Sequence, residues 1–433
     1  MNRLSPSSIH TLPGADDITR VELPNGITVL ARPNFNSPSV VLGGYLRVGS
    51  LQDPADKLGL SQFTSLALMR GTQQRSFQQI YDSLESIGAS LGFGSGVHTT
   101  SFNGRALVED LPVLLDLLRE ALQQPAFPAD QVERLRAQLL TGLAIRAQDT
   151  ADMASLTFDE LVYAGHPYAR PEDGYIETVQ AITRDDLVDF HRRGYGPRGM
   201  VVVVIGALSP EAAVEQVQQV LGDWDNPLQA EPPELPPANP LSATVTKEVI
   251  ILGKSQSDIV MGSLGPSRLS PDYMAASLGN NILGQFGMMG RIGEVVREQS
   301  GLAYYAYTSL NAGVGPGSWQ VTAGVNPVNV QKTIDLVRQE IQRFIGSPVT
   351  AEELSDSQEN YIGRLPLSLE SNQGMAGALL NLERYHLSLD YYRRYPDLVR
   401  AVTVETILEV SRRYLDADRL AIAWAGPQNQ AEG

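Results

Sequence analysis

The stretch Leu115-Asp116-Leu117-Leu118-Arg119-Glu120-Ala121-Leu122 has a counterpart about 220 residues later, Ile334-Asp335-Leu336-Val337-Arg338-Gln339-Glu340-Ile341. Both place apolar residues three and four positions apart, which is the spacing of an amphipathic helix. Each is followed by a short loop and a helix-start signal, at residues 128–132 in one case and 350–354 in the other. Two helices in the same order at one offset predict a duplicated structural unit.

The similarity continues to the end of each half of the chain. Residues 182–187 match 402–407, and the pair Arg192-Arg193 matches Arg412-Arg413. An apolar run ending in glycine then follows in each half, at 200–206 and at 420–426. Chance similarity between ordinary amphipathic helices is the alternative explanation, and the nearly constant offset argues against it.

Strand signals fill the remainder of the first half. Asn25-Gly26 lies between two β-favouring runs and predicts a hairpin. Residues 40–48 read as a strand, and the Val/Ile run at 201–205 predicts a strand in the centre of a sheet. We therefore expect an α+β fold of two homologous halves, each a mostly antiparallel sheet with helices packed on one face.

The sharpest change in composition separates the two halves. Residues 225–240 contain six prolines in a short polar stretch, which favours an extended, stiff connector over a helix or a central strand. The predicted organisation is an N-terminal half over 1–224, a linker over 225–245 and a C-terminal half over 246–433.

Composition narrows the class of protein. The chain has 433 residues and a net charge of −16, which argues against a nucleic-acid-binding surface. It has no cysteine, so disulfides and thiolate metal sites are excluded. No apolar run approaches the roughly 18 residues of a membrane span. Residues 1–6 lack the pattern of a signal peptide, so we expect a cytoplasmic protein.

One segment of the first half points to a family. The stretch Gly59-Leu60-Ser61-Gln62-Phe63-Thr64-Ser65-Leu66-Ala67-Leu68-Met69-Arg70-Gly71-Thr72 resembles the signature segment of the pitrilysin/insulinase-type metallopeptidases, or inverzincins. The resemblance covers nearly the whole chain and extends to residues 24–26, 49–50, 166–168 and 195–197. It implies a clam-like chain of two halves.

The residues that would bind zinc in this family are replaced here. The family helix reads H-x-x-E-H, and this chain has Gln62 and Leu66 at the ligand positions and Ser65 at the general-base position. The third ligand position, 77 residues after Leu66, holds Leu143. Zinc needs imidazole, thiolate or carboxylate donors. The resemblance therefore implies a chain with no cofactor and no catalytic activity of its own.

Other catalytic sites find little support in the sequence. The five histidines, at positions 10, 98, 166, 191 and 386, never fall within one helical turn of each other. We expect His98 on a strand face, His166 as a cap of backbone groups in a loop, and His191 in a polar surface turn. A nucleophilic Ser65 is a third possibility, but no histidine lies near it in sequence to activate it.

The second half keeps a different part of the family pattern. Residues 290–304 resemble a segment that carries an arginine and, seven residues later, a tyrosine, here Arg297 and Tyr304. In the family this pair binds the substrate's backbone carbonyls opposite the zinc. A guanidinium and a phenol are suitable donors for that task. The alternative is that Arg297 forms an exposed ion pair and Tyr304 fills a strand face.

The resemblance as a whole implies a processing-peptidase-like, non-catalytic subunit of a metalloendopeptidase complex. A homologous partner would carry the zinc helix, and this chain would supply Arg297 and Tyr304 to bind peptides or unfolded segments. The rival interpretation is a structural or peptide-binding protein, a homodimer without any proteolytic role. A neighbouring gene that encodes H-x-x-E-H would favour the heterodimer.

Overall fold

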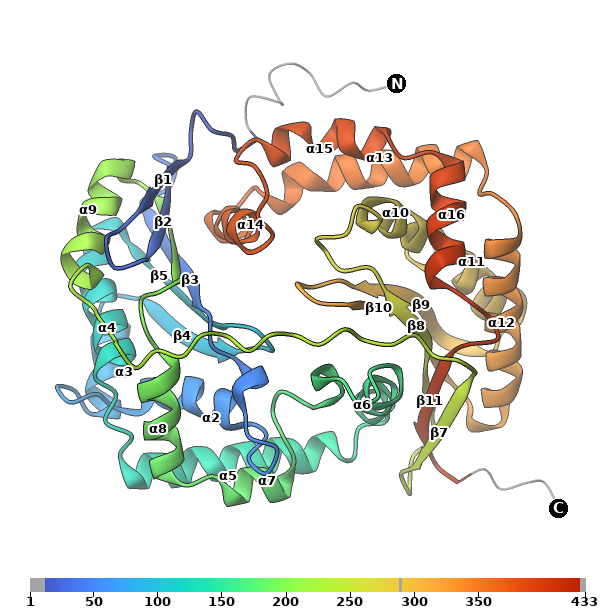
Figure 1. The fold of residues 1–433 in the computed structure, drawn as a ribbon, viewed down its shortest axis with the longest axis horizontal. Coiled ribbons are helices and arrows are strands. Elements are labelled where there is room, and N and C mark those ends of the chain that lie inside the picture. Colours follow the sequence, from blue (N-terminus) through green and yellow to red (C-terminus); the bar gives the residue numbers. More distant parts are fainter. Residues whose placement is uncertain (1–11, 288–289, 429–433) are drawn as a thin grey trace. The chain divides into compact units, whose positions relative to one another are not determined.

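The computed structural model describes residues 12–287 and 290–428. The chain forms two compact units, each assembled from three separate stretches. The first unit comprises the chain through Leu143, Pro171–Glu234 and Leu365–Arg394. The second comprises Ala144–Arg170, Leu235–Arg364 and the chain from Tyr395 onward. Each is a mixed α+β unit around one sheet (Figure 1).

The first unit contains a six-stranded sheet with the order β1-β2-β6-β3-β5-β4. Only the β2–β6 pair is parallel, so the sheet is mostly antiparallel as expected. The predicted hairpin joins β1 to β2, with Gly26 at φ +89° in the turn. The Val/Ile run forms β6 in the interior of the sheet. The strands are β1 Thr19–Glu22, β2 Thr28–Pro33, β3 Ser39–Leu46, β4 Ser90–Ser95, β5 Thr100–Leu107 and β6 Val201–Gly206.

Helices cover one face of this sheet and bury its alternate side chains. Leu42, Val202 and Val204 point into a cluster that also contains Leu114 and Leu118. Fully burying each such side chain contributes about 1.5–3 kcal/mol to folding. The helices of the first half are α2 Leu60–Ala67, α3 Phe77–Ser86, α4 Leu111–Gln123, α5 Ala129–Arg146, α7 Ile176–Ala181, α8 Arg184–Gly194 and α9 Pro210–Leu221.

A helix from the far end of the chain covers the opposite face. This helix, α14 Asn372–Arg384, packs on β3 and β6. Leu380 and Ala376 of this helix lie against Gly43 of β3, and Asn372 donates to the Ser39 backbone oxygen at 3.4 Å. The sheet is therefore covered on both faces, whereas the sequence predicted helices on one.

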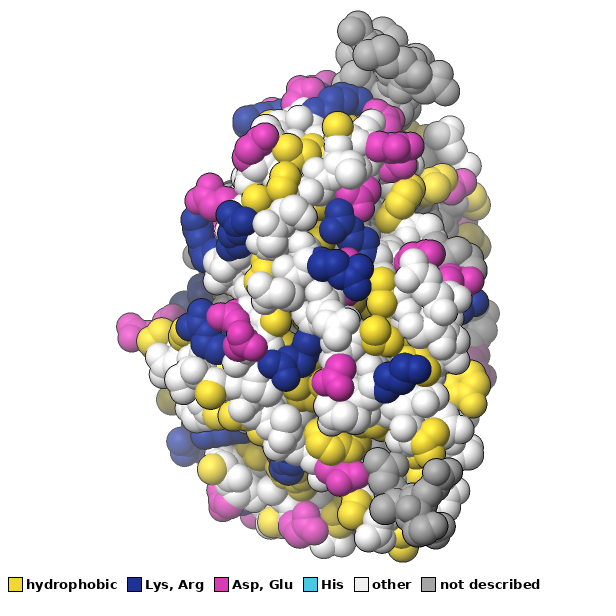
Figure 2. Space-filling view, turned by 90° about the vertical axis from the view of Figure 1, so that its right-hand side faces the viewer, with side chains coloured by type: hydrophobic (Ala, Val, Ile, Leu, Met, Phe, Trp, Pro, Cys, Tyr) yellow, Lys and Arg dark blue, Asp and Glu magenta, His cyan; other side chains and the backbone are white. Residues whose placement is uncertain are grey.

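The second unit repeats this plan with a five-stranded sheet of order β7-β11-β8-β10-β9. Again a single pair, β7–β11, is parallel. On the face that carries α12 and α16, basic and acidic side chains are interspersed rather than gathered by sign (Figure 2). The strands are β7 Val245–Ile250, β8 Ser257–Gly265, β9 Ala303–Asn311, β10 Gly317–Val325 and β11 Ala421–Gly426, and the two helices are α12 Val330–Gly346 and α16 Val404–Tyr414.

A helix of the first half completes the second unit. This helix, α6 Thr150–Val162, buries Ala154 and Phe158 against Val260 and the alanines of β11. The opposite face of the sheet packs on helices of the second half, where Gly279 lies against Trp319 and Ile407. The remaining helices are α10 Tyr273–Gly284, α11 Gly290–Gly293, a π-helix over Glu294–Gln299, α13 Ala351–Ser368 and α15 Tyr391–Arg400.

The predicted repeat corresponds to equivalent elements. The quoted stretches form α4 and α12, and the arginine pairs end α8 and α16. Both α8 and α16 start at a threonine N-cap, Thr183 or Thr403, whose side chain accepts a backbone N–H. Helices α6 and α14 occupy equivalent places and are exchanged between the units. The division at 1–224, 225–245 and 246–433 stays a prediction, and the compact units exchange residues 144–170 and 365–394 across it.

Candidate functional site

A buried carboxylate fixes the start of α2, the helix that carries three of the four replaced zinc-site residues. Asp53 is 5% exposed and accepts backbone hydrogen bonds from Gly59 and Ser61, each at 2.9 Å. Gly59 adopts φ +93°, a conformation that favours glycine. Burial raises the pKa of Asp53 to about 7, although the backbone N–H groups oppose that shift.

The amide of Gln62 links α2 to the neighbouring strand. Its Oε1 accepts the backbone N–H of Ser95, at the end of β4, at 3.0 Å. The Ser65 hydroxyl is fully buried and donates to the Gln62 backbone oxygen at 2.8 Å, within its own helix. Both polar groups thus satisfy the local backbone. The hydroxyl thus donates its proton to a backbone oxygen and not to a basic side chain, which is not the arrangement of an activated nucleophile.

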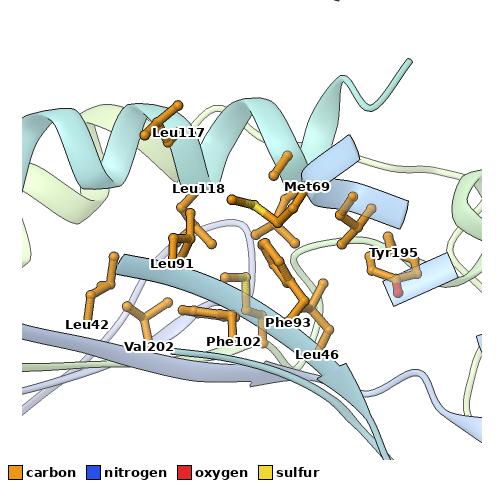
Figure 3. Packing of buried hydrophobic residues seen from close by; sticks show 14 of the residues in the cluster. Leu42, Leu46, Met69, Leu91, Phe93, Phe102, Leu117, Leu118, Tyr195 and Val202 are labelled. Atoms are coloured by element: carbon orange, nitrogen blue, oxygen red, sulfur yellow. The ribbon is translucent and has the colours of Figure 1, made fainter. Parts of the chain in front are cut away.

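The two leucines at ligand positions belong to the hydrophobic core of the first unit. Leu143 is 5% exposed within the large cluster, and Leu66 packs against the same cluster. Figure 3 shows the middle of this cluster, where Leu118 of α4 points towards Leu91 of the sheet. Aliphatic side chains offer a metal no lone pair. Within residues 12–287 and 290–428, no three His, Cys, Asp or Glu side chains form a group suited to a metal ion.

Two of the histidine expectations need correction. His98 lies in the loop between β4 and β5, not on a strand face. His191 lies in α8, where it stacks on Tyr195 with ring centroids 4.9 Å apart and contacts the Leu122 backbone oxygen at 2.8 Å. Burial lowers the pKa of His191 to about 4. It therefore belongs to the core side of α8 and not to a polar surface turn. Residue 10 lies outside the described residues.

The expectation for His166 is confirmed. Its Nδ1 accepts the Tyr168 backbone N–H at 3.1 Å, so this nitrogen is unprotonated. Its Nε2 lies 2.9 Å from the Pro236 backbone oxygen and donates to it. The ring thereby attaches the proline-rich connector to the second unit. These hydrogen bonds give His166 a structural role.

Arg297 and Tyr304 lie on adjacent elements of the second unit. Arg297 is in the π-helix, a rare geometry that is frequent at functional sites. Gly301, at φ +61°, donates its N–H to the Arg297 backbone oxygen at 3.0 Å and turns the chain into β9. The Arg297 side chain is 36% exposed, with Glu298 3.5 Å away, and Tyr304 is 67% exposed. Both side chains are thus accessible to a ligand.

Sequence reasoning missed a buried polar cluster beside this segment. Asp258 of β8 is 2% exposed and accepts hydrogen bonds from Thr150, Gln256 and Tyr305. Burial, followed by the contact with Asp258, raises the pKa of Tyr305. The cluster joins the first residue of α6 to β8 and β9. Its only signal in the sequence is a carboxylate at the start of an apolar strand, which requires donors when buried.

Comparison with known proteins identifies the family. The model described as Insulinase (Peptidase family M16) matches residues 28–166. The model described as Peptidase M16 inactive domain matches residues 181–361.

Among the helices of the described residues, none is long and apolar enough to cross a membrane.

Curated relatives align over most of the chain. An uncharacterized zinc protease of Mycobacterium leprae is 27% identical over 419 residues, covering 95% of this chain and 92% of the relative. The mitochondrial-processing peptidase subunit beta of Saccharomyces cerevisiae is 26% identical over 371 residues, covering 81% and 78%. The relatives' names thus associate the family with zinc.

Solved structures share the whole architecture. A peptidase M16 inactive domain from Pseudomonas fluorescens superposes with a TM-score of 0.88 at 26% identity, covering 96% of this chain and 100% of the other. A protease from Helicobacter pylori superposes with a TM-score of 0.87 at 19% identity, with the same coverage, and shows the fold alone. The family-model matches in both halves and these alignments agree: the chain belongs to peptidase family M16, the insulinase family.

Proposed function

We propose that this chain is the non-catalytic, substrate-positioning subunit of a heterodimeric zinc peptidase that acts on peptides or unfolded segments. One observation carries the proposal. The positions that would bind zinc hold Leu143 in the hydrophobic core, Leu66 packed against that core, and Gln62 hydrogen-bonded to a strand. A zinc site there would need new donor groups and a new core. The activity must then come from a partner.

The chain's own contribution is the pair Arg297 and Tyr304. Their guanidinium and phenol groups are exposed on adjacent elements and offer several hydrogen-bond donors. Zinc in the partner would supply the activated water, and this chain would hold the peptide carbonyl. A donor aimed at a developing oxyanion contributes about 2.7–4 kcal/mol to the transition state. The relative named as a processing peptidase subunit supports a role within a complex.

The first experiment looks for the partner. The tagged full-length chain is purified from its native cell, and co-purifying proteins are identified by mass spectrometry. The proposal expects a family member with H-x-x-E-H, and zinc in the complex but not in the isolated chain. A chain that self-associates without such a partner supports the structural or peptide-binding homodimer instead. Peptide cleavage by the isolated chain with zinc would contradict the proposal.

The second experiment tests the two donors in the reconstituted complex. Arg297→Ala and Tyr304→Phe are compared with Arg400→Ala and Tyr307→Phe. Arg400 is a half-exposed arginine in a weak ion pair, like Arg297, and Tyr307 is a partly exposed tyrosine of β9. The proposal expects turnover to fall only for the first pair, with assembly intact by size-exclusion chromatography. Equal turnover in all four variants would remove the assigned role.

A further inference from the structure

The first unit has a cavity of about 590 Å³ beside the start of α2. Its walls come from the segment that leads into α2, from α8 along its length and from the beginning of the proline-rich connector. Leu51, Leu60 and Phe190 form an apolar surface within it. Cavities of about 300–1,000 Å³ with apolar walls and a few polar groups are the usual size and character of small-ligand sites.

Two charges of opposite sign border this cavity and lack a partner. Neither the Arg193 guanidinium nor the Asp56 carboxylate has a hydrogen bond or ion pair with any other residue that the structure describes. The other charges that line the cavity are paired: Lys57 with Asp186, Asp189 with Arg192 at 2.7 Å, and Glu231 with Arg198 at 3.9 Å. The Arg193 backbone is held in place because its oxygen accepts the Ala230 N–H at 2.7 Å. The cavity thus presents one unpaired cation, one unpaired anion and an apolar wall.

The internal repeat supplies a comparison. Arg413 is the counterpart of Arg193, and it borders a cavity of about 650 Å³ in the second unit. There it donates to Asp272 at 2.7 Å and to Glu409 at 2.9 Å. Arg419 at the same cavity pairs with Asp416 at 2.7 Å. Arg412 donates to two backbone oxygens of the second unit. The second cavity therefore has its arginines occupied, and only the first leaves one available.

We propose that the cavity of the first unit binds short peptides with free termini, with Arg193 binding the α-carboxylate and Asp56 the α-ammonium group. An arginine suits a carboxylate because its planar fork donates two parallel hydrogen bonds. Apolar side chains of the peptide would rest on Leu51, Leu60 and Phe190. Three extended residues span about 10 Å, which is the separation that the two charged groups would have to match for a tripeptide. The proposal is independent of the zinc partner, because the site lies within one unit of this chain.

The test is isothermal titration calorimetry, in which trileucine is added to the isolated full-length chain in the absence of zinc. Acetylating the amino end or amidating the carboxyl end is expected to weaken binding about fivefold each, roughly 1 kcal/mol. In Arg193→Ala the acid and the amide should bind equally, and in Asp56→Asn the free and acetylated peptides should bind equally. These variants and ligands form double-mutant cycles that isolate each pair.

Two controls locate the site. Arg192→Ala removes the adjacent, ion-paired arginine, and Arg413→Ala removes the counterpart in the second unit. Both are expected to keep the preference for the free acid, and all variants should keep the wild-type melting temperature because the substituted side chains are exposed. The proposal is overturned if trileucine shows no saturable binding at millimolar concentration. Equal binding of acid and amide by the wild type also overturns it, as does loss of the preference in Arg413→Ala instead of Arg193→Ala.

Discussion

The side-chain oxygen of Gln62 accepts the backbone N–H of Ser95 at 3.0 Å, and so joins α2 to the end of β4. Gln62→Leu leaves this part-buried N–H without its acceptor, which is expected to destabilise the fold by about 1 kcal/mol. Gln62→Glu keeps an acceptor and should lie closer to the wild type. Chemical denaturation of the three proteins measures the difference. Equal stability of the leucine and glutamate variants would show that the hydrogen bond contributes nothing.

Leu143→Glu would place a carboxylate where the family has its third ligand. Because Leu143 is buried in the core, we expect the substitution to cost about 3 kcal/mol or more. Adding zinc should not restore the stability, since Gln62 and Leu66 supply no suitable ligand. The matched control is Ile145→Glu in the same helix, where the side chain is 67% exposed and the change should be within about 0.5 kcal/mol. Zinc-dependent recovery of Leu143→Glu would contradict this account of the site.

Protonation of His191 is expected to destabilise the chain in acid. Its folded pKa of about 4 is below the unfolded value near 6.5, so the unfolded chain binds more protons between these values. The stabilisation is complete above pH 6.5 or so and is lost as the pH falls to about 4, up to about 3 kcal/mol. His191→Gln has no titrating group, so its pH profile of stability should lack this loss. If both proteins lost the same stability as the pH falls from 6.5 to 4, the loss would come from groups other than His191.

Asp53 should act in the opposite direction over nearly the same range. Its folded pKa of about 7 lies above the unfolded value near 3.9, so the folded chain binds more protons in between. Stability from this group is present below about pH 4 and is lost as the pH rises through 7. We expect Asp53→Asn to abolish this pH dependence, because the amide does not titrate, while its single oxygen can accept only one of the two backbone N–H groups that Asp53 binds. Thermal unfolding at pH 5 and pH 8 tests this expectation. If the melting temperature of the variant changed between the two pH values as much as that of the wild type, the expectation would be refuted.

Loss of either donor in the second unit should slow the reconstituted peptidase. For Arg297→Ala we expect kcat/KM to fall about 100- to 1,000-fold, the effect of removing one oxyanion donor. Tyr304→Phe removes a single hydroxyl and should lie at the lower end. Steady-state kinetics with a quenched-fluorescence peptide measures both. A rise in KM with unchanged kcat would instead mean that the pair binds the substrate equally in the ground state and in the transition state.

The repeat and the hairpin were predictable because they depend on local chemistry. Asn25-Gly26 requires a positive φ in its turn, and the apolar spacing of α4 and α12 defines one buried face each. His191 was placed wrongly because the charged neighbours 192 and 193 suggested a surface turn. The correct signal was present: Leu187, one helical turn earlier, marks the buried side of α8.

Two other features had no local signal. The pattern of an amphipathic helix tells which side is buried but not which sheet receives it, so the positions of α6 and α14 were not accessible. The cluster at Asp258 depends on Thr150 and Tyr305, which are distant in sequence. In the candidate site, the replaced residues were visible from the sequence. Their packing, and the unpaired state of Arg193 and Asp56, required the structure.

The exchange of α6 and α14 also has a consequence for biosynthesis. The strands of the first sheet precede α14 in the chain by more than 160 residues, so its β3–β6 surface lacks this covering helix until α14 has been synthesised. Cutting the connector would therefore yield two fragments that each lack a covering helix of their own sheet, rather than two self-sufficient domains. We therefore expect both sheets to complete their packing only after the helices of the two halves have been synthesised.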